Sequence, residues 1–258
     1  MKLNRFAVAA IATVSLSLGA NAALAQDVVR IGTEGAYPPY NFTDSDGNLV
    51  GFEIDLANAI CVEAGVSCEF VAQDWDGIIP ALLASRYDAI MAGMSITEER
   101  KEVVDFTRMY FTTPARFIAA KDSGITETTP EALAGKTIGT QSATIHANFL
   151  EDLYDDSDIR LYPTQDEVNL DLAAGRIDLL LADSSATADW LETDDGSCCA
   201  YLPGDYTDPE YFGEGVGIAV RQEDDELREK LNAAITTLEA DGTIDALAAE
   251  WFPFLATQ

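Results

Sequence analysis

The chain is poor in residue types on which common enzyme and nucleic-acid-binding sites depend. Its 258 residues include a single histidine, His146, which rules out a histidine cluster for a metal ion and a histidine-based triad network. Neither a Gly-x-Ser-x-Gly motif nor a glycine-rich phosphate loop occurs. Asp and Glu are abundant, so carboxylate acid or base chemistry stays open. An enzyme therefore has no positive support from motifs.

Basic residues are also scarce, with 15 Lys and Arg against 45 Asp and Glu, a formal net charge of −30. Nucleic acid and anionic lipid surfaces would repel such a chain, so we expect neither as a partner. The acidity is compatible with a cationic ligand. It is equally compatible with a solvated acidic surface, because net charge reports mainly on solubility.

Long apolar runs are absent except at the N-terminus. Lys2 and Arg5 precede an apolar run from Phe6 to Leu18, and small residues follow up to Ala25. This layout predicts a cleaved secretory signal over residues 1–25, since the run is short of the ~20 residues that a membrane span needs. We expect an exported, soluble product that begins near Gln26 and is not inserted in a membrane. No cysteine lies near the cleavage point, so we do not expect a lipid anchor.

Only four cysteines are present. An exported chain permits disulfides, and we hypothesise a bridge between Cys61 and Cys68, which would close a small loop after a helix. The neighbours Cys198 and Cys199 could form a ring with each other, bridge to another chain, or stay unpaired. The sequence leaves these alternatives open.

Expected strands and helices alternate along the first part of the chain. The pattern predicts strands at Val28–Thr33, Cys68–Ala72 and Tyr87–Ala92, and helices at Glu53–Ala64 and Gly77–Ala84. This order predicts an α/β sheet with crossover helices.

Two stretches of the chain recur later in the same order. Residues 30–36 (RIGTEGA) match 137–143 (TIGTQSA) at Ile, Gly, Thr and Ala, and residues 81–97 match 171–187 at seven positions. Strands and helix turns can resemble one another by composition alone. We prefer two lobes of related architecture, because both matches occur in the same order.

Polar turns follow four of the expected strands: EGAYPPY, AGMSITEER, TQSATIH and ADSSAT. Ligands of open α/β sheets bind beyond the carboxyl ends of strands, so we expect these turns to face one cleft. Pro38 and Pro39 restrict the backbone around Tyr37, which is thereby held as a fixed wall.

Charged and aromatic residues in these turns, and in the turn at residues 73–77 after another expected strand, suit a small zwitterion. Arg100 lies at an expected helix start and could hold a carboxylate, although such arginines are often surface residues. Asp183 stands where the first half has Gly93, and could pair with an ammonium group. Trp75 and Tyr37 could enclose an aliphatic or cationic stem, unless both are core residues.

Motifs spread over nearly the whole chain after residue 26 resemble one family. They are VRIGTEGAYPPYNF, GFEIDLANAIC, FVAQDWDGIIPALLASRYDAIMAGMSITEER, GKTIGTQSAT, NLDLAAGRIDLLLAD, FGEGVGIAVRQEDDELREKLNAAI and DGTIDALAAEWF. The chain is similar to the periplasmic polar amino-acid-binding proteins of ATP-binding cassette (ABC) importers, solute-binding protein family 3, in the branch for lysine, arginine, ornithine, histidine and opines.

The resemblance implies an α/β, two-lobe type II periplasmic-binding-protein fold with a two-crossover hinge. We expect lobe 1 to comprise residues 26–113 and 208–258, and lobe 2 to comprise residues 114–207. The crossings are expected near Phe111–Pro114 and Thr207–Phe212, which would allow hinge closure around a ligand.

The resemblance also implies roles for individual residues. Arg100, Ser95, Thr144 and turn amides would hold a ligand carboxylate, Asp183 its α-amino group and Glu34 the cationic end of its side chain, with Tyr37 and Trp75 stacking on the stem. The full expected set is Glu34, Tyr37, Trp75, Ala92, Gly93, Ser95, Arg100, Gln141, Thr144 and Asp183, with Cys61 and Cys68 as the family's disulfide. Ala92, Gly93 and Ile145 depart from the family pattern, because related binders often carry hydroxyl residues there.

The implied function is capture of a basic amino acid, namely arginine, ornithine or lysine, or histidine or an opine, for delivery to an ABC permease. We expect a periplasmic monomer without cofactor or metal that is not an enzyme. Two alternatives are a cyclohexadienyl (prephenate or arogenate) dehydratase-like enzyme on the same fold and a ligand-sensing partner of a receptor.

Overall fold

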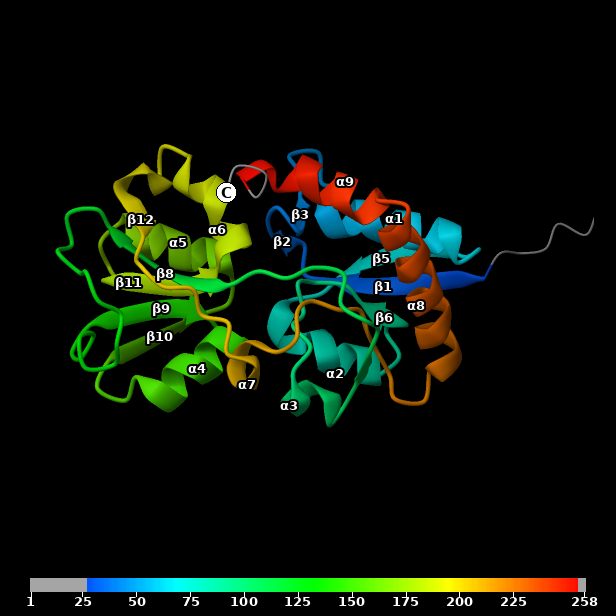
Figure 1. Ribbon diagram of the computed structural model, residues 1–258, viewed down its shortest axis with the longest axis horizontal. Coiled ribbons are helices and arrows are strands. Elements are labelled where there is room, and N and C mark those ends of the chain that lie inside the picture. Colours follow the sequence, from blue (N-terminus) through cyan, green and yellow to red (C-terminus); the bar gives the residue numbers. More distant parts are fainter. Residues whose placement is uncertain (1–26, 255–258) are drawn as a thin grey trace, which may run out of the picture.

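The computed structural model describes residues 27–254, and Figure 1 shows them as two α/β lobes side by side. The expected signal segment therefore lies outside the described residues. Each lobe contains a five-stranded sheet. Two segments cross between the lobes and run next to each other, with bridge pairs Phe111↔Val216 and Ala115↔Tyr206. The predicted two-lobe fold with two crossings is confirmed.

The sheet of the first lobe has the strand order β5-β1-β6-β13-β7. Strand β1 pairs in parallel with β5 and β6, whereas β13 is antiparallel to both β6 and β7. Because β13 comes from the C-terminal part of the chain, this lobe is assembled from two separate segments. The strands are β1 (Val28–Thr33), β5 (Ser67–Ala72), β6 (Ala89–Ile90), β7 (Asp105–Phe106) and β13 (Ala219–Val220).

Helices cover both faces of this sheet (Figure 1). Helices α1, α8 and α9 pack together over a core that contains Phe52, Leu56 and Leu231, and α2 covers the other face with Ile78 and Leu82. The helices of the lobe are α1 (Phe52–Glu63), α2 (Ile78–Leu83), α3 (Glu98–Lys101), α8 (Asp225–Ala240), α9 (Thr243–Trp251) and the 3₁₀ turn η1 (Trp75–Gly77). A small sheet joins β2 (Ala36–Tyr37), β3 (Asn41–Thr43) and β4 (Leu49–Val50).

The sheet of the second lobe has the order β10-β9-β11-β8-β12, with β9 parallel to β10 and β11 and with β8 antiparallel to β11 and β12. Its strands are β8 (Ala115–Ala120), β9 (Thr137–Gln141), β10 (Asp158–Tyr162), β11 (Leu179–Asp183) and β12 (Cys199–Tyr201). The helical elements are α4 (Ile145–Leu153), α5 (Gln165–Ala173), α6 (Ser184–Leu191) and η2 (Gly196–Cys198). Helix α7 (Pro209–Phe212) belongs to the second crossing segment and packs on α4. All five strands of this sheet come from one continuous stretch.

The predicted elements of the first part occur with shifted ends. Strand β1 has the predicted bounds, while the predicted helix 77–84 begins as the 3₁₀ turn η1 before α2. The predicted strand 87–92 shortens to β6, because the chain bends at Ala92 and Gly93, with Gly93 at φ +63°. No helix among residues 27–254 is long and apolar enough to cross a membrane.

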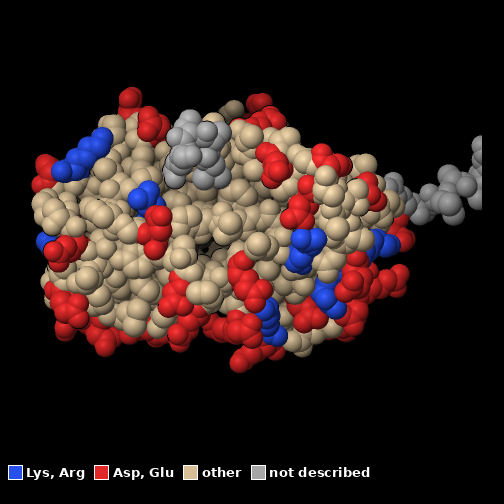
Figure 2. Space-filling view, in the orientation of Figure 1, with Lys and Arg blue, Asp and Glu red and all other residues tan. Residues whose placement is uncertain are grey.

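Both cysteine pairs are bonded in the structure. Cys61 at the end of α1 is joined to Cys68 in β5, and Cys198 is joined to its neighbour Cys199. Of the alternatives for the second pair, the structure therefore has the ring between neighbours. Figure 2 shows acidic side chains spread over the visible face with few basic ones, in agreement with the composition.

Candidate ligand-binding site

A cavity lies between the lobes, where the turns that follow four strands meet. Strands β1 and β6 lead into it from the first lobe, and β9 and β11 from the second. All ten expected site residues line this cavity together with Ile145, His146 and Gln165, which were not among them. The sequence did hold one signal that His146 belongs to the site. It lies in the first turn of a helix that directly follows one of the predicted binding turns.

Glu34 lines the cavity and is only 8% exposed. Gln141 of the other lobe donates from Nε2 to Glu34 Oε1 over 2.6 Å. Burial raises the pKa of Glu34 to about 7, a rise that nearby carboxylates reinforce and the bond from Gln141 opposes. No Lys or Arg among residues 27–254 forms an ion pair with Glu34, so its charge has no protein cation.

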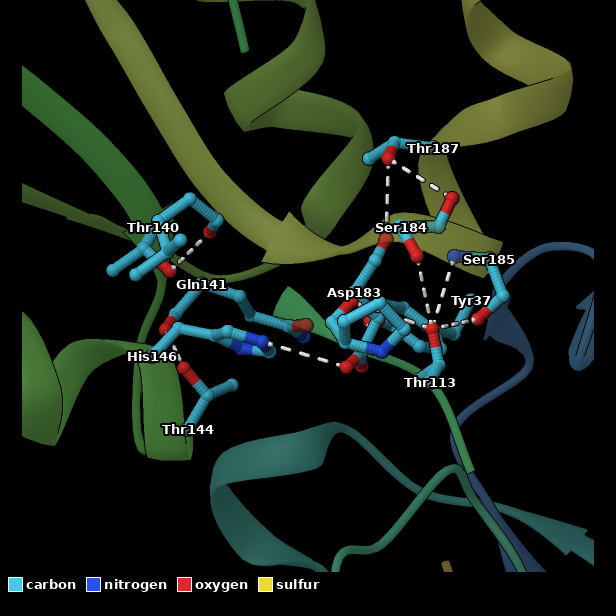
Figure 3. Close-up of polar contacts among 12 residues, drawn as sticks. Tyr37, Thr113, Thr140, Gln141, Thr144, His146, Asp183, Ser184, Ser185 and Thr187 are labelled. Atoms are coloured by element: carbon cyan, nitrogen blue, oxygen red, sulfur yellow. Dashed lines mark hydrogen bonds and ion pairs between the residues drawn. The ribbon is translucent and has the colours of Figure 1, made fainter. Parts of the chain in front are cut away.

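Asp183 lies at the N-cap of α6 and is also 8% exposed. Tyr37 of the first lobe donates its hydroxyl to Asp183 Oδ2 over 2.6 Å. Burial first, and then the Asp183 carboxylate, raise the pKa of Tyr37 well above its usual value, so Tyr37 remains a hydroxyl donor. Figure 3 shows these side chains converging with His146, whose Nε2 lies 3.5 Å from Asp183 Oδ1.

Arg100 supplies the positive charge of the cavity. Its helix α3 begins at Thr97, whose hydroxyl accepts from Arg100 N over 3.3 Å, and its Nη1 donates to Ser95 O over 2.9 Å. The guanidinium lies over the Trp75 ring at 5.4 Å from the centroid. Burial lowers the pKa of Arg100 to about 10, so it stays charged at neutral pH. Among the described residues, no carboxylate forms an ion pair with it.

The two aromatic residues are buried at the cavity and are held in place. Trp75 is 8% exposed and donates from Nε1 to Ala143 O of the other lobe over 3.0 Å. Tyr37 is 6% exposed, and a Cβ atom at Gly93 would lie 3.4 Å from its ring. A contact at that distance is ordinary, so glycine is favoured at position 93 by the positive φ of its backbone.

A buried carboxylate outside the cavity positions two of its turns. Glu53 in α1 is 1% exposed and accepts from Gly93 N and Asn41 Nδ2, each over 2.7 Å, and from the Tyr110 hydroxyl. Asn41 in turn accepts from Gly35 N over 2.7 Å. Burial raises the pKa of Glu53 while these donated hydrogen bonds lower it. The Gly93 amide is therefore already hydrogen-bonded to Glu53. The sequence analysis did not identify Glu53 as a residue that shapes the site.

Thr144 acts mainly on its own turn. Its hydroxyl caps α4 by accepting from Ala147 N over 3.2 Å and donates to Gln141 O over 2.7 Å. The side chain thus shapes the turn, and the backbone amides at the start of α4 lie beside it. Ala92 contributes no polar side chain, as the sequence indicated.

Hydrogen bonds join the lobes directly around the cavity, so the structure is closed. Besides Tyr37 to Asp183, Gln141 to Glu34 and Trp75 to Ala143, the pairs are Tyr40 with Ser185 (2.6 Å), Ser142 with Asp76 (2.8 Å) and Asn148 with Glu99 (3.0 Å). Each joins residues far apart in the sequence, and each would break if the lobes moved apart.

Two α/β lobes closed over a small polar cavity define a hinged ligand-binding protein. The chain belongs to the bacterial extracellular solute-binding proteins, family 3, whose model matches residues 29–254. Its relatives named below are binding proteins rather than enzymes.

Known members of the family are similar over most of the chain. The L-arginine-binding protein of Pseudomonas aeruginosa is 43% identical over 230 residues, covering 88% of each chain. A Salmonella typhimurium periplasmic binding protein with high arginine specificity superposes with a TM-score of 0.81 at 32% identity, covering 88% of this chain and 99% of that one. A Silicibacter pomeroyi binding protein of the His/Glu/Gln/Arg/opine family, solved with lysine, gives a TM-score of 0.78 at 38% identity, covering 87% and 96%.

Proposed function

We propose that this protein captures a basic amino acid, arginine, ornithine or lysine, in the periplasm and delivers it to an ABC permease. One observation carries the proposal. The cavity is lined by two buried carboxylates and one partly buried guanidinium, Glu34, Asp183 and Arg100. Apart from His146, whose Nε2 lies 3.5 Å from Asp183 Oδ1, none of the three has an ion-pair partner among residues 27–254. Unpaired buried charges are costly, so the site is complementary to a ligand with two cations and one anion.

The roles that the family resemblance implies suggest how such a ligand would lie. Its carboxylate would meet Arg100 beside Ser95 and the start of α4, and its α-ammonium would meet Asp183. The cationic side-chain end would reach Glu34, and the stem would pass between Tyr37 and Trp75. A basic amino acid carries these charges in this order, whereas glutamate would place a carboxylate against Glu34.

The hinge would convert binding into a signal for the permease. We propose lobe boundaries after residues 113 and 207, within the two crossing segments, and a monomer as the working unit. A ligand that contacts both lobes shifts the hinge only by its greater affinity for the closed form. Loaded protein would then present the closed surface to the permease.

Export rests on the N-terminal sequence and on relatives described as periplasmic. We propose that residues 1–25 direct the chain to the periplasm and are cleaved. The family membership supports an ABC permease as the partner.

Isothermal titration calorimetry of the mature protein tests the ligand class. We expect micromolar or tighter binding of L-arginine, L-ornithine or L-lysine and no heat with L-glutamate. Preference for glutamate would contradict the proposal. Incubation with prephenate, followed by ultraviolet detection of product, tests the enzyme alternative, and turnover there would replace a pure binding role.

A further inference from the structure

His146 lines the cavity and has a ring nitrogen that makes no hydrogen bond within residues 27–254. The side chain is 5% exposed, and its Nε2 has no hydrogen-bond partner among the described residues. Buried polar atoms are nearly always paired, so an orphan of this kind needs an explanation. Figure 3 shows the ring directed at Asp183, and His146 also lines the cavity. The atom is therefore placed to contact whatever lies beside Asp183.

The position of His146 follows from the turn before it. Thr144 caps α4, so His146 falls in the first helical turn, where the helix dipole disfavours a positive charge. The separation of 3.5 Å between Nε2 and Asp183 Oδ1 is within ion-pair range but gives no hydrogen bond. The geometry accommodates an additional donor that both atoms could share.

The charged surroundings of His146 come from several elements. Asp183 at the start of α6, Tyr37 in β2, Glu34 after β1 and Arg100 in α3 line the same cavity. Helix α7, which packs on α4, presents the ring of Phe212, 6.0 Å from the imidazole centroid. The acidic side chains nearby on α4 and α7, Asp152 and Glu210, line a separate cavity.

We propose that His146 is a further ligand-binding residue that accepts a hydrogen bond from the α-ammonium group of the bound amino acid, and that its protonation opposes binding. This proposal rests on the proposed function. Neutral Nε2 is an acceptor and would share the ammonium with Asp183. Protonated Nε2 becomes a donor, pairs with Asp183 itself and repels the ammonium, so binding at low pH must release this proton to solvent.

Histidine is the residue type whose ordinary titration spans physiological pH, so this contact makes affinity depend on acidity. If the complex requires neutral His146, affinity falls by at most about tenfold per pH unit below the titration midpoint in the free protein. Alkaline conditions leave the contact intact. The effect needs an ammonium beside Asp183, and a ligand without one should not show it.

The single histidine permits a direct measurement. In protein carrying no histidine tag, the imidazole carbon-bound proton signals in NMR belong to His146 alone. We would titrate the protein between about pH 5 and 8 without ligand, with saturating L-arginine, and with 5-guanidinopentanoate, which is arginine without its α-amino group. His146→Gln confirms the assignment by losing the signals.

We expect L-arginine to lower the titration midpoint of His146 by about 0.5 pH units or more, and 5-guanidinopentanoate not to lower it. An unchanged or raised midpoint with L-arginine, or an equal fall with both ligands, would overturn the proposal. The proposal would also be overturned if His146 in the ligand-free protein did not titrate between about pH 5 and 8.

Calorimetry with L-arginine provides a second readout. The acid-induced loss of affinity should be smaller in His146→Gln than in the unaltered protein, by up to about tenfold per pH unit, while Glu34 contributes equally to both. Equal losses would contradict the role of His146. If L-arginine fails to bind the unaltered protein at alkaline pH, the proposed function fails instead, so the two failures are distinguishable.

Discussion

The two lobes contain the same structural unit, and the site arises where they differ. Ile31 of β1 pairs with Ala89 of β6, and Ile138 of β9 pairs with Leu179 of β11. The two sequence matches align Ile31 with Ile138 and Ala89 with Leu179, so the two pairs are equivalent. The recurrence of residues 30–36 and 81–97 in the second half therefore reflects one strand register used twice.

The equivalence extends to side-chain contacts. Asp88 accepts from Arg30 N over 3.0 Å, and Asp178 accepts from Thr137 N over 2.8 Å. A Cβ atom at Gly32 would come within 2.5 Å of the Tyr87 ring, and one at the equivalent Gly139 within 2.5 Å of Ile177 Cδ1. Gly32 thus leaves room for Tyr87, just before β6, to pack against β1. Gly139 leaves room in the same way for Ile177, just before β11, to pack against β9.

The turns that follow these strands diverge. Gly93 has φ +63°, whereas the equivalent Asp183 has φ −57° and stands at the N-cap position of α6. The first lobe supplies Arg100, Glu34 and the aromatic rings, and the second supplies Asp183, the acid that we propose binds the α-ammonium group. The comparison teaches that the two lobes share one framework and differ in the turns that line the cavity, as our proposal requires of turns that hold opposite parts of one ligand.

The largest expected effect is a loss of ligand affinity on removing Asp183, the acid at the position equivalent to Gly93 of the first lobe. Asp183→Ala should weaken L-arginine binding by about 2–5 kcal/mol, because truncating one partner of a buried charge pair leaves the other unpaired. Calorimetry near neutral pH measures the loss. Asp189→Ala, which removes an exposed acid from the same helix α6, is the matched control and should change binding by less than about 0.5 kcal/mol. Equal affinity in Asp183→Ala would remove Asp183 from the site.

A smaller effect on folding should appear at the two equivalent glycines. Gly32→Ala and Gly139→Ala should each lower the free energy of unfolding by about 1–3 kcal/mol, because the added methyl group overpacks the core. Gly32→Ala should cost more, since a rigid Tyr87 ring yields less than the end of Ile177. Denaturant unfolding monitored by circular dichroism provides the comparison.

Ile177→Val offers a matched rescue, because it removes the Cδ1 atom that the new Cβ in Gly139→Ala would meet. The double variant should recover part of the lost stability. No recovery, or no cost in either single variant, would show that the contacts of the two glycines are not equivalent in energy.

The smallest expected effect is a pH dependence of L-arginine affinity that comes from Glu34, the acid of the first lobe. The pKa of Glu34 is raised to about 7, and a ligand cation would favour its ionised form. L-arginine affinity should therefore fall as pH drops below 7, by at most about tenfold per pH unit from this group. Glu34→Gln should bind more weakly at alkaline pH but show a flatter pH dependence, as measured by calorimetry. An equally steep dependence in Glu34→Gln would assign the effect to another group.

The same shift has a consequence for stability without ligand. Between pH 4.5 and about 7, folded Glu34 holds a proton that the unfolded chain has released. Its contribution to the free energy of unfolding is thus fully present below pH 4.5 and is lost as pH rises toward 7. Glu34→Gln should remove this part of the pH dependence in denaturant unfolding.

Much of the fold could be predicted because its causes are local. Alternating apolar runs and turn residues indicated β1, α1 and β5 within a few residues, and the internal matches indicated the paired lobes. The end of β6 was wrong because the bend at Gly93 depends on contact with Glu53 and Tyr37, which belong to other elements. Sequence patterns do not report such contacts.

The site was predictable to the extent that its residues stand in recognisable turns. His146 and Gln165 were missed, since each looks like an ordinary residue in the first turn of a helix. Only the packing of α4 and α5 around the cavity directs them inward. Glu53 was missed for the opposite reason, because a buried acid in an apolar helix face is indistinguishable in sequence from an exposed one.

The sequence by itself determined the elements, their duplication and the chemical types available in the turns, because propensity and periodicity act over a few residues. The tertiary structure decided which of those residues meet. Tyr37 and Asp183, 146 positions apart, share a hydrogen bond, and Glu34 is buried against Gln141 at a separation of 107. The charge state of Glu34 and the orphan nitrogen of His146 depend on burial between the lobes, which exists only once the chain has folded and the lobes have closed.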